Sequence, residues 1–243
     1  MPYRKQQFTE GGIYHITLRG IDNNLIFKNI DDYYRGIFSI YEFNNKKSVS
    51  ILKRRRDIKA GKNKLLKVGR GPASAKLDLR DKLVEVLTFC FMPNHIHLLL
   101  RQITKGGITK FLSKVGTGFA GYFNRKYGRK GYVFQNRFRS VYIKDDEQLK
   151  TVFAYIHSNP VSLIEPKWKE SGIKNLKKVI KFLEDYKWSS YLDYIGKKNF
   201  PSVTDRKFLS ETMNGGKGCR EFINDWIKYK SIIRISEDFP LEE

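Results

Sequence analysis

The feature that most constrains the fold is a pair of apolar segments separated by a three-residue turn. Leu83 to Phe91 is dense in apolar residues and predicts a strand at the centre of a sheet. Met92 to Asn94 predicts a turn, and His95 to Gln102 predicts a second strand. Strands joined by so short a connection pair as an antiparallel hairpin. We therefore expect an antiparallel sheet built around residues 83–102.

Strand and helix patterns alternate on either side of this hairpin. Ile13 to Arg19 alternates as a half-buried strand does, and residues 31–45 carry apolar side chains at helical spacing. The same signals after the hairpin predict a helix over 107–127, a strand over 132–143, and a helix from Asp145 or Asp146 to Ser158, ended by Pro160. This βαββαβ order is typical of a ferredoxin-like α+β fold, an antiparallel sheet with two helices on one face, here with an added helix.

The remaining chain, from Val161 onward, is expected to be helical and rich in loops. Short helices are predicted near residues 205–213 and 219–229. We divide the chain into a domain over 1–195 and a helical C-terminal extension over 196–243.

The charge of the chain indicates a polyanionic partner. The 243 residues carry 47 Lys and Arg against 25 Asp and Glu, a net charge of +22. Nucleic acid is the usual partner of so basic a protein. Residues 46–82 hold 14 of the cations and 3 Asp, so half of the excess lies in one glycine-interrupted segment, interpreted as a basic insertion. The alternative is a solvated loop that only improves solubility.

Other compositional features exclude several classes of protein. Apolar residues at 40% and aromatic residues at 14% exclude a disordered chain, and two cysteines exclude a disulfide scaffold or a four-cysteine zinc site. The first residues lack a signal-peptide core, and no apolar run reaches the ~20 residues that a membrane span needs. We expect a cytoplasmic, nucleoid-associated protein.

The sharpest local motif is His95-Ile96-His97. Residues i and i+2 of a strand share a face, so both imidazoles project from one side while Ile96 enters the core. That geometry suits a divalent cation. On spacing alone, however, a structural role is the commoner explanation.

The predicted helix that ends at Pro160 carries a second motif. Its buried stripe consists of Leu149, Val152, Phe153 and Ile156. Tyr155 and Asn159 are four residues apart beside this stripe, so a phenol and an amide face the same way. The phenol could act as a nucleophile and the amide could complete a metal site, although a tyrosine beside a buried stripe is usually a packing residue.

A third motif is the segment 122–139, which contains six basic and six aromatic residues and no acid. Interleaved cations and rings suit single-stranded nucleic acid, because they neutralise phosphates and stack on bases. An ordinary basic surface beside a core strand is the alternative.

Four ordered stretches resemble the single-tyrosine HUH transposases, and most closely their REP-associated tyrosine transposase branch. They are MPNHIHLLL, YFNRKYGRKGYVFQNRFRS, YIHSNPV and YKWSSYLDYIG, and YHITLRG near the N-terminus also fits. The resemblance covers about residues 10–195 apart from the basic insertion. It implies a ferredoxin-like HUH nuclease domain that nicks and rejoins single-stranded DNA through a 5′-phosphotyrosine.

The resemblance also implies roles for individual residues. His95 and His97 match the metal-binding pair, Tyr155 matches the nucleophile, and Asn159 falls where a polar side chain completes the site for Mg²⁺ or Mn²⁺. The partner is expected to be single-stranded or hairpin DNA, bound by a monomer or homodimer. The expected DNA-binding residues are Arg19, Arg54, Arg55, Arg56, Arg125, Lys126, Arg129, Lys130, Arg137 and Arg139.

Two other functions remain open. The chain could be a hairpin-DNA-binding protein or repressor that has lost cleavage, although the presence of both histidines and Tyr155 argues against this. Charge alone would also allow an RNA-binding protein.

Overall fold

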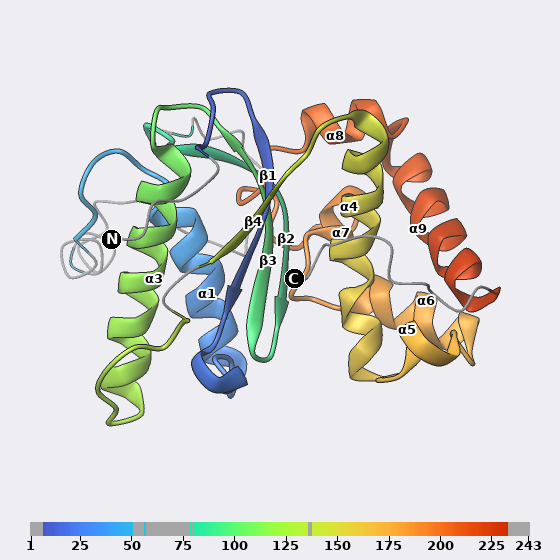
Figure 1. Ribbon diagram of the computed structural model, residues 1–243, viewed down its shortest axis with the longest axis horizontal. Coiled ribbons are helices and arrows are strands. Elements are labelled where there is room, and N and C mark those ends of the chain that lie inside the picture. The colour runs from blue at the N-terminus through green and yellow to red at the C-terminus, as the bar shows by residue number, and fades with distance from the viewer. Residues whose placement is uncertain (1–6, 51–55, 57–77, 79, 136–137, 233–243) are drawn as a thin grey trace.

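A four-stranded antiparallel sheet lies between two layers of helices in the computed structural model (Figure 1). The structure describes residues 7–50, 56, 78, 80–135 and 138–232. Four strands form the sheet in the order β2-β3-β1-β4: β1 (Ile13–Arg19), β2 (Val84–Met92), β3 (His95–Gln102) and β4 (Arg139–Tyr142). This order and the antiparallel pairing confirm the ferredoxin-like α+β class.

One face of the sheet packs on two helices, as predicted. They are α1 (Ile30–Glu42) and α3 (Gly107–Lys126), which lie side by side (Figure 1). Alternate residues of β3 enter the core on this face, because Ile96, Leu98 and Leu100 all point towards it. Asn29 begins α1 by accepting hydrogen bonds from Asp31 N and Asp32 N through its side chain.

The opposite face is covered as well. The chain continues after β4 into α4 (Asp146–Ser158), which packs against β2 and β3 and begins at Asp145, as expected. A second core forms between these elements and the later helices. The remaining elements are η2 (Asn159–Leu163), α5 (Trp168–Ser171), α6 (Leu176–Asp185), α7 (Tyr191–Tyr194), α8 (Lys207–Thr212) and α9 (Gly215–Ile232).

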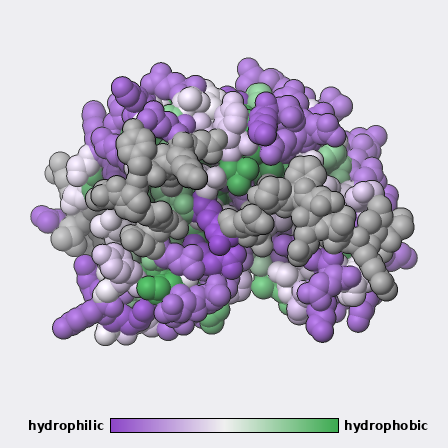
Figure 2. Space-filling model, in the orientation of Figure 1, coloured by the Kyte–Doolittle hydropathy of each residue, from purple (hydrophilic) through white to green (hydrophobic). Residues whose placement is uncertain are grey.

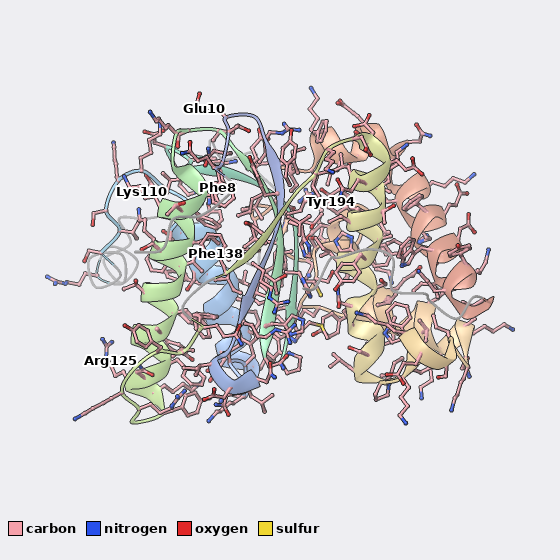
Figure 3. All side chains as sticks on the ribbon, in the orientation of Figure 1. Phe8, Glu10, Lys110, Arg125, Phe138 and Tyr194 are labelled. Atoms are coloured by element: carbon pink, nitrogen blue, oxygen red, sulfur yellow. The ribbon has the colours of Figure 1, made fainter. Side chains whose placement is uncertain are left out.

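The outer helices contact both α4 and the sheet. Buried residues of α9 pack in the same core as α4, and Tyr194 of α7 donates to Leu87 O at 2.7 Å (Figure 3). Hydrophilic residues dominate the outward surface in Figure 2. The proposed domain boundary near residue 195 stays a prediction.

Three element predictions need correction. The strand expected over 132–143 is reduced to β4, because Val133 and Phe134 bury their side chains in the core while Phe134 forms only an isolated bridge with Gly20. The α-helix ends at Ser158 as predicted, but Pro160 lies in the 3-10 helix η2, which follows directly. The helix expected over 219–229 is the longer α9.

Most of the predicted basic insertion lies outside the described residues. Its two ends meet, because Lys46 N donates to Asp81 O at 2.7 Å and the side chains of these residues form an ion pair of 2.9 Å.

Candidate active site

The two histidines of the motif lie on β3 directly after the turn of the β2–β3 hairpin. Antiparallel pairing with β1 places Arg19 opposite His95 and Thr17 opposite His97. Both imidazoles leave the sheet on the face that α4 covers, as their i, i+2 spacing predicts. His95 is partly exposed at the hairpin end, whereas His97 is fully buried.

A third histidine joins the pair. His15 on β1 is buried, and its Nε2 lies 3.0 Å from Nδ1 of His97. The other nitrogen of His97, Nε2, lies 3.0 Å from Nε2 of His95. His95 Nδ1 in turn lies 2.6 Å from Asn94 Oδ1. The result is a row of three rings in which both nitrogens of His97 have a partner.

Burial keeps His97 neutral. Desolvation, followed by the nearby charges of His95, His15, Lys169 and Arg19, lowers the pKa of His97 well below its usual 6.5. A neutral imidazole is the form that ligates metal ions.

The residues present suit a cation held by two imidazoles. Two neighbouring ligands about 2.1 Å from an octahedral ion lie about 3.0 Å apart. The Nε2 atoms of His95 and His97 show this separation. His15 cannot join them on one ion, because it faces the opposite nitrogen of His97. The described residues contain no cluster of three His, Cys, Asp or Glu that could hold a metal ion.

Tyr155 faces the histidine row from α4. Helix α4 buries Leu149, Val152, Phe153 and Ile156 as predicted, and Tyr155 lies beside them with 9% of its surface exposed. Its ring centre is 5.7 Å from those of both His15 and His97, and the rings meet edge to face. The structure thus brings the predicted nucleophile and the predicted metal-binding pair together from separate layers.

The Asn159 side chain makes a hydrogen bond that the sequence did not predict. Its amide nitrogen donates to the carbonyl of Tyr155 at 2.9 Å, one turn back along the helix. The side chain is 5% exposed and helps to close the end of α4. Its proposed role as a metal ligand stays a prediction.

The predicted DNA-binding cations are spread over the molecule. Arg54, Arg55 and Arg137 lie outside the described residues, and Arg56 is exposed. Arg19 lies beside the site, opposite His95. Arg125, Lys130 and Arg139 are exposed, and Figure 3 shows Arg125 extending outward from the end of α3. The Arg129 guanidinium lies 5.6 Å from the centre of the Phe123 ring.

Lys126 has a structural partner. Its ammonium donates to the buried carboxylate of Asp32 at 2.8 Å. Asp32 also accepts from the hydroxyls of Tyr122 at 2.9 Å and Tyr127 at 2.6 Å. These two tyrosines thereby tie α3 to the start of α1, which separates them from the histidine row.

Sequence reasoning missed two residues that contact Tyr155. His15 had a usable signal, because the alternation of residues 13–19 places His15 and Thr17 on one face of β1 and an antiparallel neighbour could then meet His97. Lys169 has no local signal. It lies on α5, with Nζ 5.1 Å from the centre of the Tyr155 ring.

Part of the chain matches a known protein family. The model of the family described as "Transposase IS200 like" matches residues 47–159, which include His95, His97, Tyr155 and Asn159. Over this span, a little under half of the chain, the sequence is similar to the IS200-like transposases. The resemblance inferred from the motifs is thereby confirmed, and the match indicates a DNA-processing enzyme.

A solved structure of a REP-associated tyrosine transposase bound to a REP hairpin is among the proteins to which this chain is similar. The two chains are 16% identical, with a TM-score of 0.46 over 85% of this chain and 96% of the other. No curated protein matches the sequence. Within the described part of the chain, no helix is long and apolar enough to cross a membrane.

Proposed function

We propose that this protein cuts and rejoins single-stranded DNA through a covalent bond between Tyr155 and a 5′ phosphate. The observation that carries the proposal is the contact between Tyr155 and His97, whose ring centres lie 5.7 Å apart, while His97 and His95 bring their Nε2 atoms to 3.0 Å. The proposed nucleophile and the two proposed nitrogen ligands thus lie near one partly exposed end of the sheet.

The chemistry is a transesterification. The Tyr155 oxygen attacks the phosphorus of a phosphodiester and loses its phenolic proton. The bond from phosphorus to the 3′ oxygen breaks, and that oxygen takes up a proton to become a 3′-OH. One phosphodiester replaces another, so attack by a 3′-OH on the phosphotyrosine reverses the reaction and rejoins the strand.

His95 and His97 would hold a divalent cation through Nε2. Two imidazole nitrogens suit Mn²⁺ better than Mg²⁺. Such an ion polarises a phosphate oxygen and stabilises the negative charge of the transition state. His15 contributes by fixing His97, because it occupies Nδ1 and leaves Nε2 directed towards His95.

The decisive experiment replaces Tyr155 with Phe and follows adduct formation. Labelled single-stranded DNA from the sequence flanking the gene is incubated with Mn²⁺ and protein, then analysed on a denaturing gel. Wild type should form a covalent adduct and Tyr155→Phe should not, since Phe keeps the ring but has no nucleophile. Tyr122→Phe and Tyr127→Phe are matched controls that should still form it. An adduct with Tyr155→Phe, or one mapped to another tyrosine, contradicts the proposal.

Two further arms separate the alternatives. A repressor that has lost cleavage would bind hairpin DNA without any adduct, and an RNA-binding protein would prefer RNA in a panel of single-stranded DNA, duplex DNA and RNA.

The role of the proposed metal ligands is tested with His95→Ala, because His95 is partly exposed. His97→Ala is less informative than sequence reasoning suggested, since His97 is fully buried and its loss also removes the partner of His15.

A further inference from the structure

A cavity of about 360 Å³ lies between the loop after β1 and the chain after α3. It is lined by Asn24, Leu25, Lys28 and Arg129. Ligand pockets in proteins begin at about 300 Å³, so the cavity has room for one small molecule or for one unit of a polymer.

Backbone hydrogen bonds attach the loop that lines the cavity to the β2–β3 turn. Gly20 N donates to Asn94 O at 2.7 Å, and Ile26 N donates to Pro93 O at 2.9 Å. Asn94 directly precedes His95, and its side-chain oxygen contacts the His95 ring. Figure 1 shows this turn and the end of α3 at the same end of the molecule. A DNA strand that passes over the turn from the proposed metal ligands would therefore reach the cavity.

The backbone of the loop fixes one side of the cavity. Asp22 and Asn23 have φ values of 52° and 56°, a left-handed conformation that Asp and Asn adopt more readily than most residues. Asn24 N closes this turn by donating to Ile21 O at 2.9 Å. Gly20 passes so close that an added Cβ would overlap Asn24 O. The loop is thus held in shape by its own contacts.

Two cations reach the cavity over the face of one aromatic ring. Lys28 Nζ and the Arg129 guanidinium each lie 5.6 Å from the centre of the buried Phe123 ring. Within the described part of the chain, neither forms an ion pair with a carboxylate. Lys126 differs from them, since its ammonium pairs with Asp32. The ring contact therefore positions Lys28 and Arg129 without neutralising their charge.

The lining has the chemistry of a nucleotide site. A phosphate accepts charge-assisted hydrogen bonds from both an ammonium and a guanidinium. Leu25 is 52% exposed, so it offers an apolar surface against which a base can pack. Asn24 is exposed, and a side-chain amide both donates and accepts, which suits the Watson–Crick edge of an unpaired base. In a duplex that edge is occupied by the partner base.

We infer that this cavity binds one unpaired nucleotide of the DNA strand that Tyr155 attacks. Lys28 and Arg129 bind its phosphate. Leu25 packs against its base, and Asn24 hydrogen-bonds to the edge of that base. The inference rests on the proposed function, and it gives the loop after β1, which lies outside the residues that match the transposase family, a direct part in binding the substrate.

The test measures binding by a protein that cannot cleave. Fluorescence anisotropy follows labelled single-stranded DNA from the sequence flanking the gene, titrated with Tyr155→Phe protein at several salt concentrations. Adding Lys28→Gln and Arg129→Gln together should weaken binding and reduce the slope of log K against log salt by about 0.7, because one phosphate contact is lost. Each single change should reduce the slope by less. Lys28→Arg should keep the slope of the parent, since it retains the charge.

A second arm tests the base. Leu25→Ala should weaken binding to single-stranded DNA with the slope unchanged, because packing involves no counterion. Binding to a duplex of the same sequence should stay the same, because a paired base cannot enter the cavity. Among probes that each lack one base, one should bind the parent more weakly than the intact strand does, and the Leu25→Ala protein should not distinguish that probe from the intact strand.

Lys207→Gln combined with Lys217→Gln is the matched control. It removes two charges whose side chains are 91% and 87% exposed. Both lie on α8 or the start of α9, which Figure 1 places at the opposite end of the molecule from the β2–β3 turn. Affinity and slope should match those of the Tyr155→Phe parent. Circular dichroism checks the fold of each variant, and the single changes carry the test if the double variant does not fold.

The outcomes separate this inference from the proposed function. An unchanged slope and affinity in the cavity variants, with an adduct still formed by wild type, would overturn the inference and leave cleavage standing. An equal loss of slope in the control, or equal weakening of duplex binding by Leu25→Ala, would overturn it as well. A reduced slope specific to the cavity without any wild-type adduct would support the nucleotide site and contradict cleavage. If the Tyr155→Phe protein does not bind single-stranded DNA at all, both are overturned.

Discussion

Replacing His15 with Phe tests whether the histidine row prepares the site. Phenylalanine keeps a flat ring between β1 and α4 but has no nitrogen to meet His97. His15 is 1% exposed, so no bulk water can replace the lost hydrogen bond. The remaining neighbour of His97 Nδ1 is Thr17 Oγ1 at 3.4 Å, longer than the 2.7–3.2 Å of an ordinary bond.

The expected effect has two parts. Leaving a buried polar nitrogen poorly bonded costs about 1–3 kcal/mol of stability. For a chain of this size that lowers the melting temperature by about 2–12 °C. Loss of a residue that orients a ligating histidine typically weakens metal affinity or activity by about 10–100-fold. The Mn²⁺ concentration that gives half-maximal adduct should therefore rise by about that factor.

Thermal unfolding and an Mn²⁺ titration of adduct formation measure the two parts separately. Thr17→Val is the control, and it should change both quantities less because its contact with His97 is longer. A lower melting temperature with an unchanged Mn²⁺ requirement would refute the reasoning, since His15 would then only fill the core.

Three other outcomes are expected. Gly118→Ala should destabilise the protein by about 1–3 kcal/mol, because the added Cβ would overlap the Phe43 ring. On the same helix, a Cβ at Gly116 meets nothing within 4 Å, so Gly116→Ala should stabilise the protein by about 1 kcal/mol. Thermal unfolding of the two variants compares these effects. Burial alone would raise the pKa of Asp32, but hydrogen bonds led by that of Lys126 lower it on balance, so its contribution to stability is present above about pH 4 and lost below. Urea unfolding should therefore show Asp32→Asn to be less stable than wild type at pH 7, with the gap closing towards pH 3. Removing metal with EDTA should abolish the adduct, and undiminished cleavage in EDTA would contradict a metal-assisted reaction.

The sequence was most informative where a pattern is local. β1 and β3 have the predicted bounds, because alternation or apolar density marks each strand and turns flank both. The prediction of one strand over 132–143 was wrong in its first half. Aromatic residues are typical of buried positions as well as of strands, so they do not distinguish the two. Only β4 joins the ladder, while Phe134 packs into the core.

The site was predictable in part for the same reason. His95 and His97 share a face by spacing alone, and Tyr155 was selected by its place in a motif. Their approach to each other depends on how α4 packs across the sheet, which no local pattern encodes. The hydrogen bond from the Asn159 amide to the Tyr155 carbonyl was not predicted, because it depends on helical structure continuing into η2.

The two halves of the site come from different layers of the fold. The histidines project from a sheet backed by α1 and α3, whereas Tyr155 belongs to the layer of α4 and the later helices. The chain links these halves through β4, a four-residue strand paired with β1. Alignment of the proposed nucleophile with the proposed metal ligands is thus set by packing between layers. Heating or mutation that softens the outer helices should misalign the tyrosine while the histidine row stays intact, so catalysis should fail at a lower temperature than the sheet.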